Sequence, residues 1–256
     1  MAWEIDWLRR AGFNMLRKHI KVEPARYYYH CDRLGMLVWQ DMPSGFNRQL
    51  RNNRKDEGEP LRLSSSREQH ELELRRMIGA LYNHPCIVMW VIHNEGWGQY
   101  ETPALTAWVK AIDPSRWCNS VTGWLDQNQG DVFDIHTYEA PPLAAANQRD
   151  RAIVIGEYGG VGWPVTGHLW NPEMRNWGYQ TYQTKDEYLA ALRAKIEALV
   201  PMTANGLSAA VYTQTSDVEG EVNGLLTYDR RIEKTTPAAL AELNRALTGA
   251  KPAAGK

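Results

Sequence analysis

The chain alternates short apolar runs with longer stretches whose apolar residues recur at helical spacing. Short runs rich in β-branched residues favour strands, and apolar positions three and four residues apart favour amphipathic helices. Because the two kinds of segment alternate, the pattern predicts parallel strands joined by crossover helices. The predicted strands are Asn14–His19, Met36–Asp41, Ile87–Asn94, Asn119–Thr122, Val132–Tyr138, Ile153–Glu157 and Ser208–Gln214. The predicted helices are Glu4–Ala11, Pro24–Leu34, Ser66–Asn83, Tyr100–Ile112, Pro142–Asn147, Lys185–Leu199 and Pro237–Leu247.

This order of elements predicts an α/β fold, a TIM-type (β/α)8 barrel that lacks its first strand. Such a barrel closes with eight strands, and the pattern contains one fewer, with a helix before the first of them. The 256 residues, 43% of them hydrophobic, are enough for one barrel-sized core. We therefore expect one catalytic domain over residues 1–247, followed by a disordered tail over residues 248–256.

A barrel without one strand would have two unpaired strand edges. A homo-oligomer could complete the open barrel, the neighbouring strands could close it, or the chain could be truncated at its N-terminus. Of these explanations we favour the homo-oligomer. Two long segments that follow strands, Ser44–Leu63 and Gly159–Thr184, are predicted to be loops that wall a substrate cleft.

Composition argues against several classes of partner. The 29 Lys and Arg residues nearly balance the 30 Asp and Glu residues, so no strong positive field would attract nucleic acid. The start of the chain lacks the order of a secretory signal, and no run of about 20 apolar residues occurs that could span a membrane. We therefore expect a cytoplasmic protein with no nucleic-acid or membrane partner.

Cysteine and histidine give no sign of a metal or a cofactor. Cys31, Cys86 and Cys118 are far apart and lie in apolar or helix-like segments, which predicts buried free thiols. The histidines have no spacing typical of a metal-ligand set, and the chain contains no phosphate-binding loop. We expect neither a metal nor a cofactor.

Two apolar segments each end in a single glutamate with glycine close behind it, and these glutamates are Glu95 and Glu157. The carboxyl ends of parallel strands meet at one face of a barrel, so the two residues are predicted to form the carboxylate pair that glycoside hydrolysis requires. One such glutamate alone is more often a solvated or salt-bridged surface residue. The bias toward tryptophan and tyrosine, 11 and 12 residues against 3 phenylalanines, also suits a sugar, whose C–H face packs on aromatic rings.

Several stretches together resemble glycoside hydrolase family 2, the family of β-galactosidases, β-glucuronidases and β-mannosidases. They are Gly12–His19, Cys31–Asp41, Asn83–Pro85 leading to Trp90, Asn94–Glu95 and Glu157–Gly160. The resemblance implies that Glu95 protonates the leaving oxygen and that Glu157 forms a glycosyl-enzyme intermediate. It also implies that Asn94 binds the sugar 2-hydroxyl, that Arg17 steadies the nucleophile and that Tyr138 donates a hydrogen bond to it.

The remaining candidates are side chains expected to line the substrate pocket: Trp39, Asp41, Trp97, Trp124, His136 and Trp163. For three of the tryptophans, Trp39, Trp124 and Trp163, ordinary core packing is the alternative. For Asp41 the alternative is a salt bridge at the rim of the barrel.

The expected activity is hydrolysis of terminal β-linked sugars with net retention, by double displacement. We expect β-galactosides as substrates because that activity is frequent in the family. Activity on β-glucuronides or β-mannosides, a carbohydrate-binding remnant with weak catalysis, and transglycosylation stay open. A glucuronide would need cations aimed at its carboxylate, and Arg230, Arg231 and Lys234 follow the last predicted strand without forming a clear motif.

Overall fold

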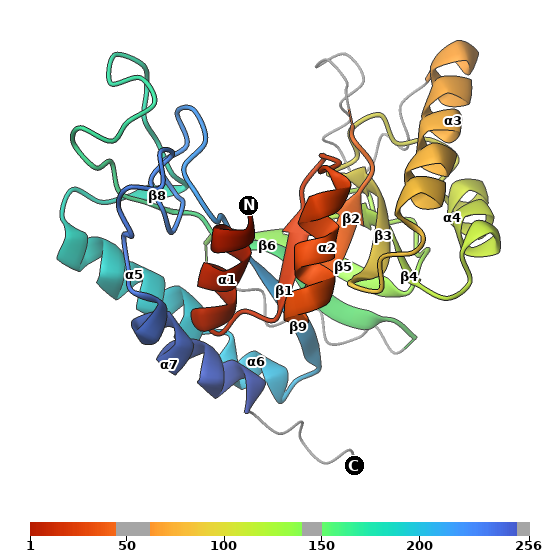
Figure 1. Cartoon of the computed structure of the whole chain (residues 1–256). Coiled ribbons are helices and arrows are strands. Elements are labelled where there is room, and N and C mark those ends of the chain that lie inside the picture. Colours follow the sequence, from red (N-terminus) through yellow and green to blue (C-terminus); the bar gives the residue numbers. More distant parts are fainter. Residues whose placement is uncertain (45–61, 140–149, 250–256) are drawn as a thin grey trace. The chain divides into compact units, whose positions relative to one another are not determined.

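Figure 1 shows the structure, a computed structural model that describes residues 1–44, 62–139 and 150–249. Its residues fall into two units. The first unit comprises Met1–Ile5, Asn14–His136 and Gln148–Gly156, and the second comprises Asp6–Phe13, Thr137–Asn147 and Glu157–Lys256. Helix α1 (Ala2–Arg10) and strand β6 (Ala152–Gly159) each run from one unit into the other.

The first unit is built on a parallel sheet whose strands follow chain order, as Figure 1 shows. The strands are β1 (Met15–Lys18), β2 (Leu37–Asp41), β3 (Ile87–Asn94) and β4 (Trp117–Thr122). Crossover helices connect them: α2 (Ala25–Leu34), α3 (Ser64–Leu81) and α4 (Thr102–Ile112). Strand β5 (Val132–Thr137) follows and is hydrogen-bonded to β6. The alternation of strand and helix that the apolar pattern predicts is therefore present.

Strand β3 is the most deeply buried element that leads to the candidate site. All its residues except Val88 are buried, which is expected for a parallel strand covered on both faces. The indole of Trp90 is fully buried and donates to the Asp113 carboxylate over 2.9 Å. The Arg116 guanidinium donates to the same carboxylate over 2.6 Å. The strand is thus a rigid support for the residues at its end.

Local sequence signals explain where several helices begin and end. Helix α2 stops at Gly35, which adopts φ 67° and returns its N–H to the last turn, a conformation that glycine adopts without strain. A capping box formed by Thr184 and Glu187 starts α5 (Lys185–Glu197). The Thr236 side chain caps α7 (Pro237–Thr248), which has proline in its first turn.

The second unit contains the end of β6 and the elements after it. These are β7 (Val161–Gly162), β8 (Gln180–Thr181), α5, α6 (Val200–Thr203), β9 (Leu207–Thr213) and α7. Strand β9 is hydrogen-bonded to β6, and α7 packs against α5 and α6.

The segment Gly159–Thr184, predicted to be a loop, contains the short parallel strands β7 and β8. The backbones of Gly162 and Gly178 approach so closely that a Cβ on Gly178 would lie 2.7 Å from the Gly162 Cα. This pairing joins residues far apart in sequence, so no local pattern predicts it. The helix predicted through Leu199 ends at Glu197 and gives way to α6. The predicted tail also begins too early, because Thr248 lies in α7.

Other predictions fall outside the described residues: the helix Pro142–Asn147, nearly all of the loop Ser44–Leu63, and residues 250–256. The three cysteines are buried and free, as predicted. Within the described ranges, no helix combines the length and the apolar character needed to cross a lipid bilayer.

Candidate active site

Glu95 lies directly after β3, where the chain turns sharply. It adopts φ 50°, a left-handed conformation that is unfavourable for a residue with a side chain. Two backbone hydrogen bonds fix the turn: Glu95 N–H donates to Thr122 O over 3.0 Å, and Trp97 N–H donates to Asn94 O over 2.9 Å. The Glu95 carboxylate is therefore positioned by a strained backbone conformation, of a kind that is common at functional sites.

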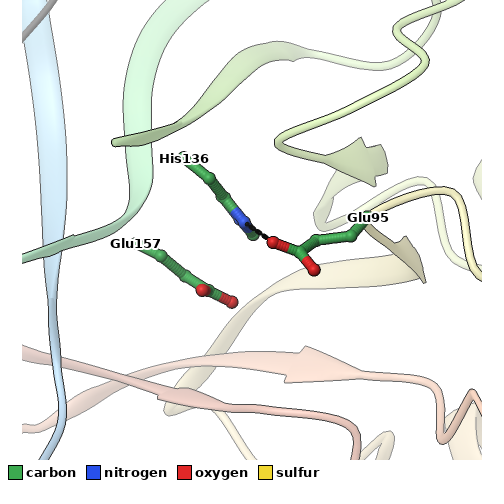
Figure 2. Close-up of side chains that lie close together, drawn as sticks. All are labelled: Glu95, His136 and Glu157. Atoms are coloured by element: carbon green, nitrogen blue, oxygen red, sulfur yellow. Dashed lines mark hydrogen bonds and ion pairs between the residues drawn. The ribbon is translucent and has the colours of Figure 1, made fainter. Parts of the chain in front are cut away.

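The imidazole of His136, from β5, contacts the Glu95 carboxylate. Figure 2 shows this contact, in which Nδ1 lies 2.9 Å from Oε1. The His136 side chain is 2% exposed and that of Glu95 is 17% exposed. A Cβ on Gly123 would lie 2.5 Å from the His136 ring, so only glycine leaves room for the ring here. His136 was predicted to line the sugar pocket, and the structure places it against Glu95.

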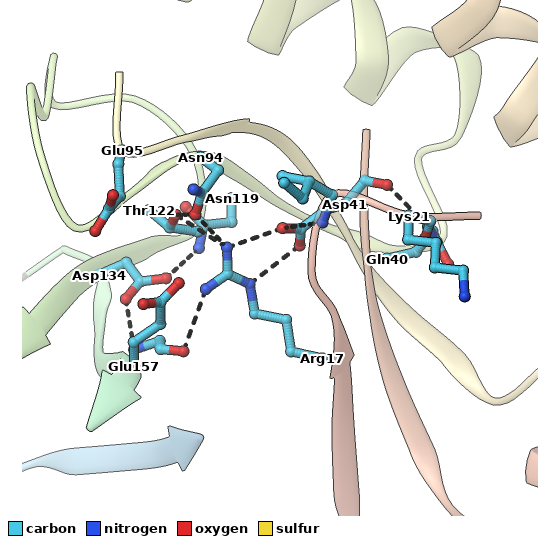
Figure 3. A network of polar contacts seen from close by, with 12 residues as sticks. Arg17, Lys21, Gln40, Asp41, Asn94, Glu95, Asn119, Thr122, Asp134 and Glu157 are labelled. Carbon is cyan, nitrogen blue, oxygen red and sulfur yellow. Dashed lines mark hydrogen bonds and ion pairs between the residues drawn. The ribbon is translucent and has the colours of Figure 1, made fainter. Parts of the chain in front are cut away.

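Arg17, from β1, forms a buried ion pair with Asp41, from β2 (Figure 3). Its guanidinium donates to both carboxylate oxygens, from Nε over 3.1 Å and from Nη2 over 2.8 Å. The two side chains are 2% and 1% exposed. Nη1 also donates to the carbonyl of Gly156, the residue before Glu157, over 3.3 Å. Asp41, predicted as a pocket residue or a salt-bridge partner, thus forms a salt bridge.

The Asn94 amide is oriented by its neighbours in the first unit. Its Oδ1 accepts from Arg17 Nη2 over 2.7 Å and from the Thr122 hydroxyl over 2.9 Å. These bonds use the oxygen side of the amide, so the NH2 group is the side that can donate to a ligand. Thr122 is hydrogen-bonded to both residues but carries no sequence signal that singles it out.

Asp134 is a buried carboxylate that the sequence analysis missed. It accepts from the Asn119 side chain over 2.6 Å and from the Gly156 N–H over 2.6 Å (Figure 3). Burial raises the pKa of Asp134 to about 6, against the opposing effect of the His136 and Arg17 charges. A charged residue two positions before His136, on the same face of a strand, was the signal available in the sequence.

In the second unit, the phenol of Tyr138 donates to the Glu157 carboxylate. Burial, together with the charge of Glu157, raises the pKa of Tyr138, so the phenol keeps its proton and acts as a donor. The Tyr138 ring stacks on Tyr179, and its backbone carbonyl accepts from Lys195 Nζ over 2.6 Å. The predicted neighbours Tyr138 and Glu157 are therefore in direct contact.

The predicted tryptophans have different surroundings. Trp39 is 3% exposed and lies in the core of the first unit. Trp97 and Trp124, in the same unit, are partly exposed. In the second unit Trp163 is partly exposed and lies against the Tyr188 ring, with centroids 5.8 Å apart.

Within either unit taken alone, the described residues bring together no three side chains with the spacing of a metal site.

Comparison with known sequences identifies related proteins. The family described as "Glycosyl hydrolases family 2, TIM barrel domain" matches residues 1–246. A beta-galactosidase of Klebsiella pneumoniae is 29% identical over 154 residues, which cover 60% of this chain and 14% of that protein. A beta-galactosidase of Vibrio cholerae is 30% identical over 121 residues, covering 45% of this chain and 11% of that protein. The chain therefore spans a small part of the length of these relatives.

Solved structures show the same fold at low sequence identity. A GH2 beta-galacturonidase from Eisenbergiella tayi, bound to galacturonate, superposes with a TM-score of 0.72 and 19% identity over 96% of this chain and 47% of that one. A beta-D-glucuronidase from Dictyoglomus thermophilum gives a TM-score of 0.68 and 17% identity over 94% of this chain and 46% of that one. With the family match, these likenesses confirm the predicted TIM-type α/β fold.

Proposed function

This chain belongs to glycosyl hydrolase family 2 through its TIM barrel domain, and we propose that it is the catalytic domain of a retaining β-glycosidase. We assign Glu95 as the general acid and base and Glu157 as the nucleophile. The observation that carries the assignment is that each carboxylate is held by a ring side chain, His136 for Glu95 and Tyr138 for Glu157. Such fixed orientation is what a reacting group needs.

In the first displacement, a Glu157 carboxylate oxygen attacks the anomeric carbon as the bond to the leaving oxygen breaks. Glu95 transfers its proton to that oxygen, so the alcohol leaves neutral. The Tyr138 phenol stabilises the ionised form of Glu157 before the attack and holds its geometry. The products of the step are the free alcohol and a glycosyl ester on Glu157.

In the second displacement, Glu95, now ionised, takes a proton from water as the water oxygen attacks the anomeric carbon. The ester bond to Glu157 breaks, and the sugar leaves with its original configuration. In this proposal the Asn94 NH2 group donates to a sugar hydroxyl, which is supported by the bonds from Arg17 and Thr122 that occupy the amide oxygen. Asp41 holds the Arg17 guanidinium that orients Asn94.

We propose β-galactosides as substrates, because the relatives that match with 29% and 30% identity are beta-galactosidases. The choice is tested by incubating the purified chain with aryl β-galactoside, β-glucoside, β-glucuronide, β-mannoside, β-arabinoside and β-fucoside. Release of the aryl alcohol from one of these sugars identifies the substrate. A chain that binds sugar but releases no alcohol would instead be the carbohydrate-binding remnant.

Azide rescue separates the roles of the two glutamates. Glu157→Ala should lower turnover by about 10⁴-fold, and azide should then yield the inverted α-glycosyl azide. Glu95→Ala should lower turnover by about 10²- to 10⁴-fold, and azide should yield the β-glycosyl azide, because the ester on Glu157 still forms. The exposed Glu68→Ala is the matched control and should keep full activity. Identical azide products from both variants would contradict the assignment.

A further inference from the structure

Glu221 is a partly buried carboxylate in the segment after β9. The Gln214 side-chain NH2 donates to its Oε2 over 2.8 Å and to Asn223 Oδ1 over 2.7 Å. Glu221 also forms a parallel bridge with Trp177, whose N–H donates to Gly220 O over 2.8 Å. The side chain and the backbone of Glu221 are therefore both held in place.

The same segment is joined to the end of β6 within the second unit. Gly160 N–H donates to Thr213 O over 3.0 Å, and Tyr179 N–H donates to Gly160 O over 3.0 Å. Thr213, the residue before Gln214, is thus hydrogen-bonded to Gly160, which lies three positions after Glu157. Burial raises the pKa of Glu221, and the negative charge of Glu157 raises it further. The ring of Tyr179 stacks on Tyr138, whose phenol donates to Glu157, so these contacts place the segment of Glu221 beside the Glu157 carboxylate.

We propose that Glu221 is a specificity-determining residue, which accepts hydrogen bonds from a neutral sugar and excludes sugars that carry a carboxylate. The proposal rests on the proposed function, in which Glu157 reacts with the sugar. An ionised carboxylate is an acceptor only, so it can take sugar hydroxyl donors and repels a uronate. The substrate class is therefore neutral β-glycosides, with uronides rejected.

The buried cation of this segment, Lys234, does not offset the negative charge of Glu221. Lys234 is fully buried, and its Nζ donates to Asp217 Oδ1 over 2.7 Å and to Val222 O over 2.8 Å. Its charge is thus compensated within the segment itself. A site that recognises a uronate normally directs a cation at the sugar carboxylate, and Lys234 is committed to Asp217.

The test uses substrate pairs that differ only at C6: aryl β-galactoside with β-galacturonide, and aryl β-glucoside with β-glucuronide. For each pair, kcat/KM is measured for the wild-type chain, Glu221→Gln and Glu219→Gln. Glu219 is an exposed glutamate two positions away and serves as the control. We expect Glu221→Gln to lower the preference for the neutral sugar by about tenfold or more, and Glu219→Gln to leave it unchanged.

The outcomes separate the two proposals. If the wild-type chain cleaves neither member of either pair, the proposed function itself is contradicted. If it cleaves the neutral sugar and Glu221→Gln leaves the preference within twofold, the role of Glu221 is overturned and the glycosidase assignment stands. If Glu221→Gln does not fold, the inhibition constants of galactose and of galacturonate are measured on the wild-type chain instead, and galactose should inhibit more tightly. Equal or tighter inhibition by galacturonate would overturn the proposal.

Discussion

At the scale of single residues, buried charge determines how much a substitution costs. Asp41 is fully buried and depends on the bidentate bonds from Arg17. By contrast, Arg10 and Asp6 form an ion pair between side chains that are 52% and 47% exposed. A buried carboxylate that loses its partner cannot recover its hydration, whereas an exposed one can.

Arg17→Met should therefore lower the free energy of unfolding by about 3–5 kcal/mol. Arg10→Met, the matched control, should lower it by less than about 1 kcal/mol. Urea unfolding followed by circular dichroism measures both values. Equal losses in the two variants would show that the Arg17–Asp41 pair does not bear the stability that we assign to it.

The sequence pattern singled out Glu95 and Glu157, because polar residues at the ends of apolar strands are visible in one dimension, and the family resemblance added Arg17 and Tyr138. It did not single out Asp134 or Glu221. Their surroundings depend on contacts with Gly156 and Gln214 that only the pairing of distant segments creates. A carboxylate inside a strand, as at Asp134, or in a segment after one, as at Glu221, is a weak signal until its partners are known.

At the scale of elements, hydrogen bonds hold strand β6 at Gly156, the residue directly before the proposed nucleophile Glu157. Gly156 N–H donates to Asp134 over 2.6 Å, and its carbonyl accepts from Arg17 over 3.3 Å. A Cβ at this position would lie 2.4 Å from the Asp134 carboxylate. Only glycine allows that carboxylate to reach the strand backbone.

Gly156→Ala should lower the free energy of unfolding by about 1–3 kcal/mol and reduce turnover as well, since the strand must shift. Gly79→Ala is the control: it lies in α3, is exposed, and has nothing within 4 Å of its added Cβ. That substitution should instead raise stability by about 0.5–1 kcal/mol. Thermal unfolding and a kinetic assay of both variants test this, and a neutral Gly156→Ala would contradict it.

The longer strands and helices could be predicted because their apolar periodicity is sustained over several residues. The strands β7 and β8 could not be predicted, since each has two residues and their pairing, Val161 with Gln180 and Gly162 with Thr181, joins segments far apart in sequence. The predicted homo-oligomer remains a prediction.

At the scale of the whole molecule, two buried histidines link stability to pH. The rings of His70, from α3, and His93, from β3, stack with centroids 5.5 Å apart. His70 Nδ1 lies 3.2 Å from the Tyr100 hydroxyl, and His93 Nε2 has no hydrogen-bond partner among the described residues. Burial lowers the pKa of His70 to about 3 and lowers that of His93 well below its ordinary value.

In the unfolded chain both imidazoles gain a proton near pH 6.5, whereas the folded chain keeps them neutral. Stability should therefore fall as pH drops below about 6.5, by about 1.4 kcal/mol per imidazole between pH 7.5 and pH 5.5. The raised pKa of Asp134, about 6, has the opposite effect, because it stabilises the folded chain as the pH falls from about 6 toward the ordinary aspartate pKa. Asp134 is present in both the wild type and the variant, so this effect is the same in both. Urea unfolding at the two pH values should show that the double variant His70→Gln with His93→Gln loses less stability at pH 5.5 than the wild type does. An equal loss of stability in the two proteins would contradict the assignment of this pH dependence to the two histidines.

In the proposed mechanism, Glu157 forms a covalent bond to the sugar during turnover. Mass spectrometry tests it after incubation with the 2-deoxy-2-fluoro-β-glycosyl fluoride of the sugar that the chain cleaves. The fluoride leaves, and the slow second step traps the ester. We predict one sugar per chain, located on the peptide that contains Glu157 and absent from Glu157→Gln. A label on another carboxylate, or an unlabelled chain that still releases an inverted sugar, would contradict the claim.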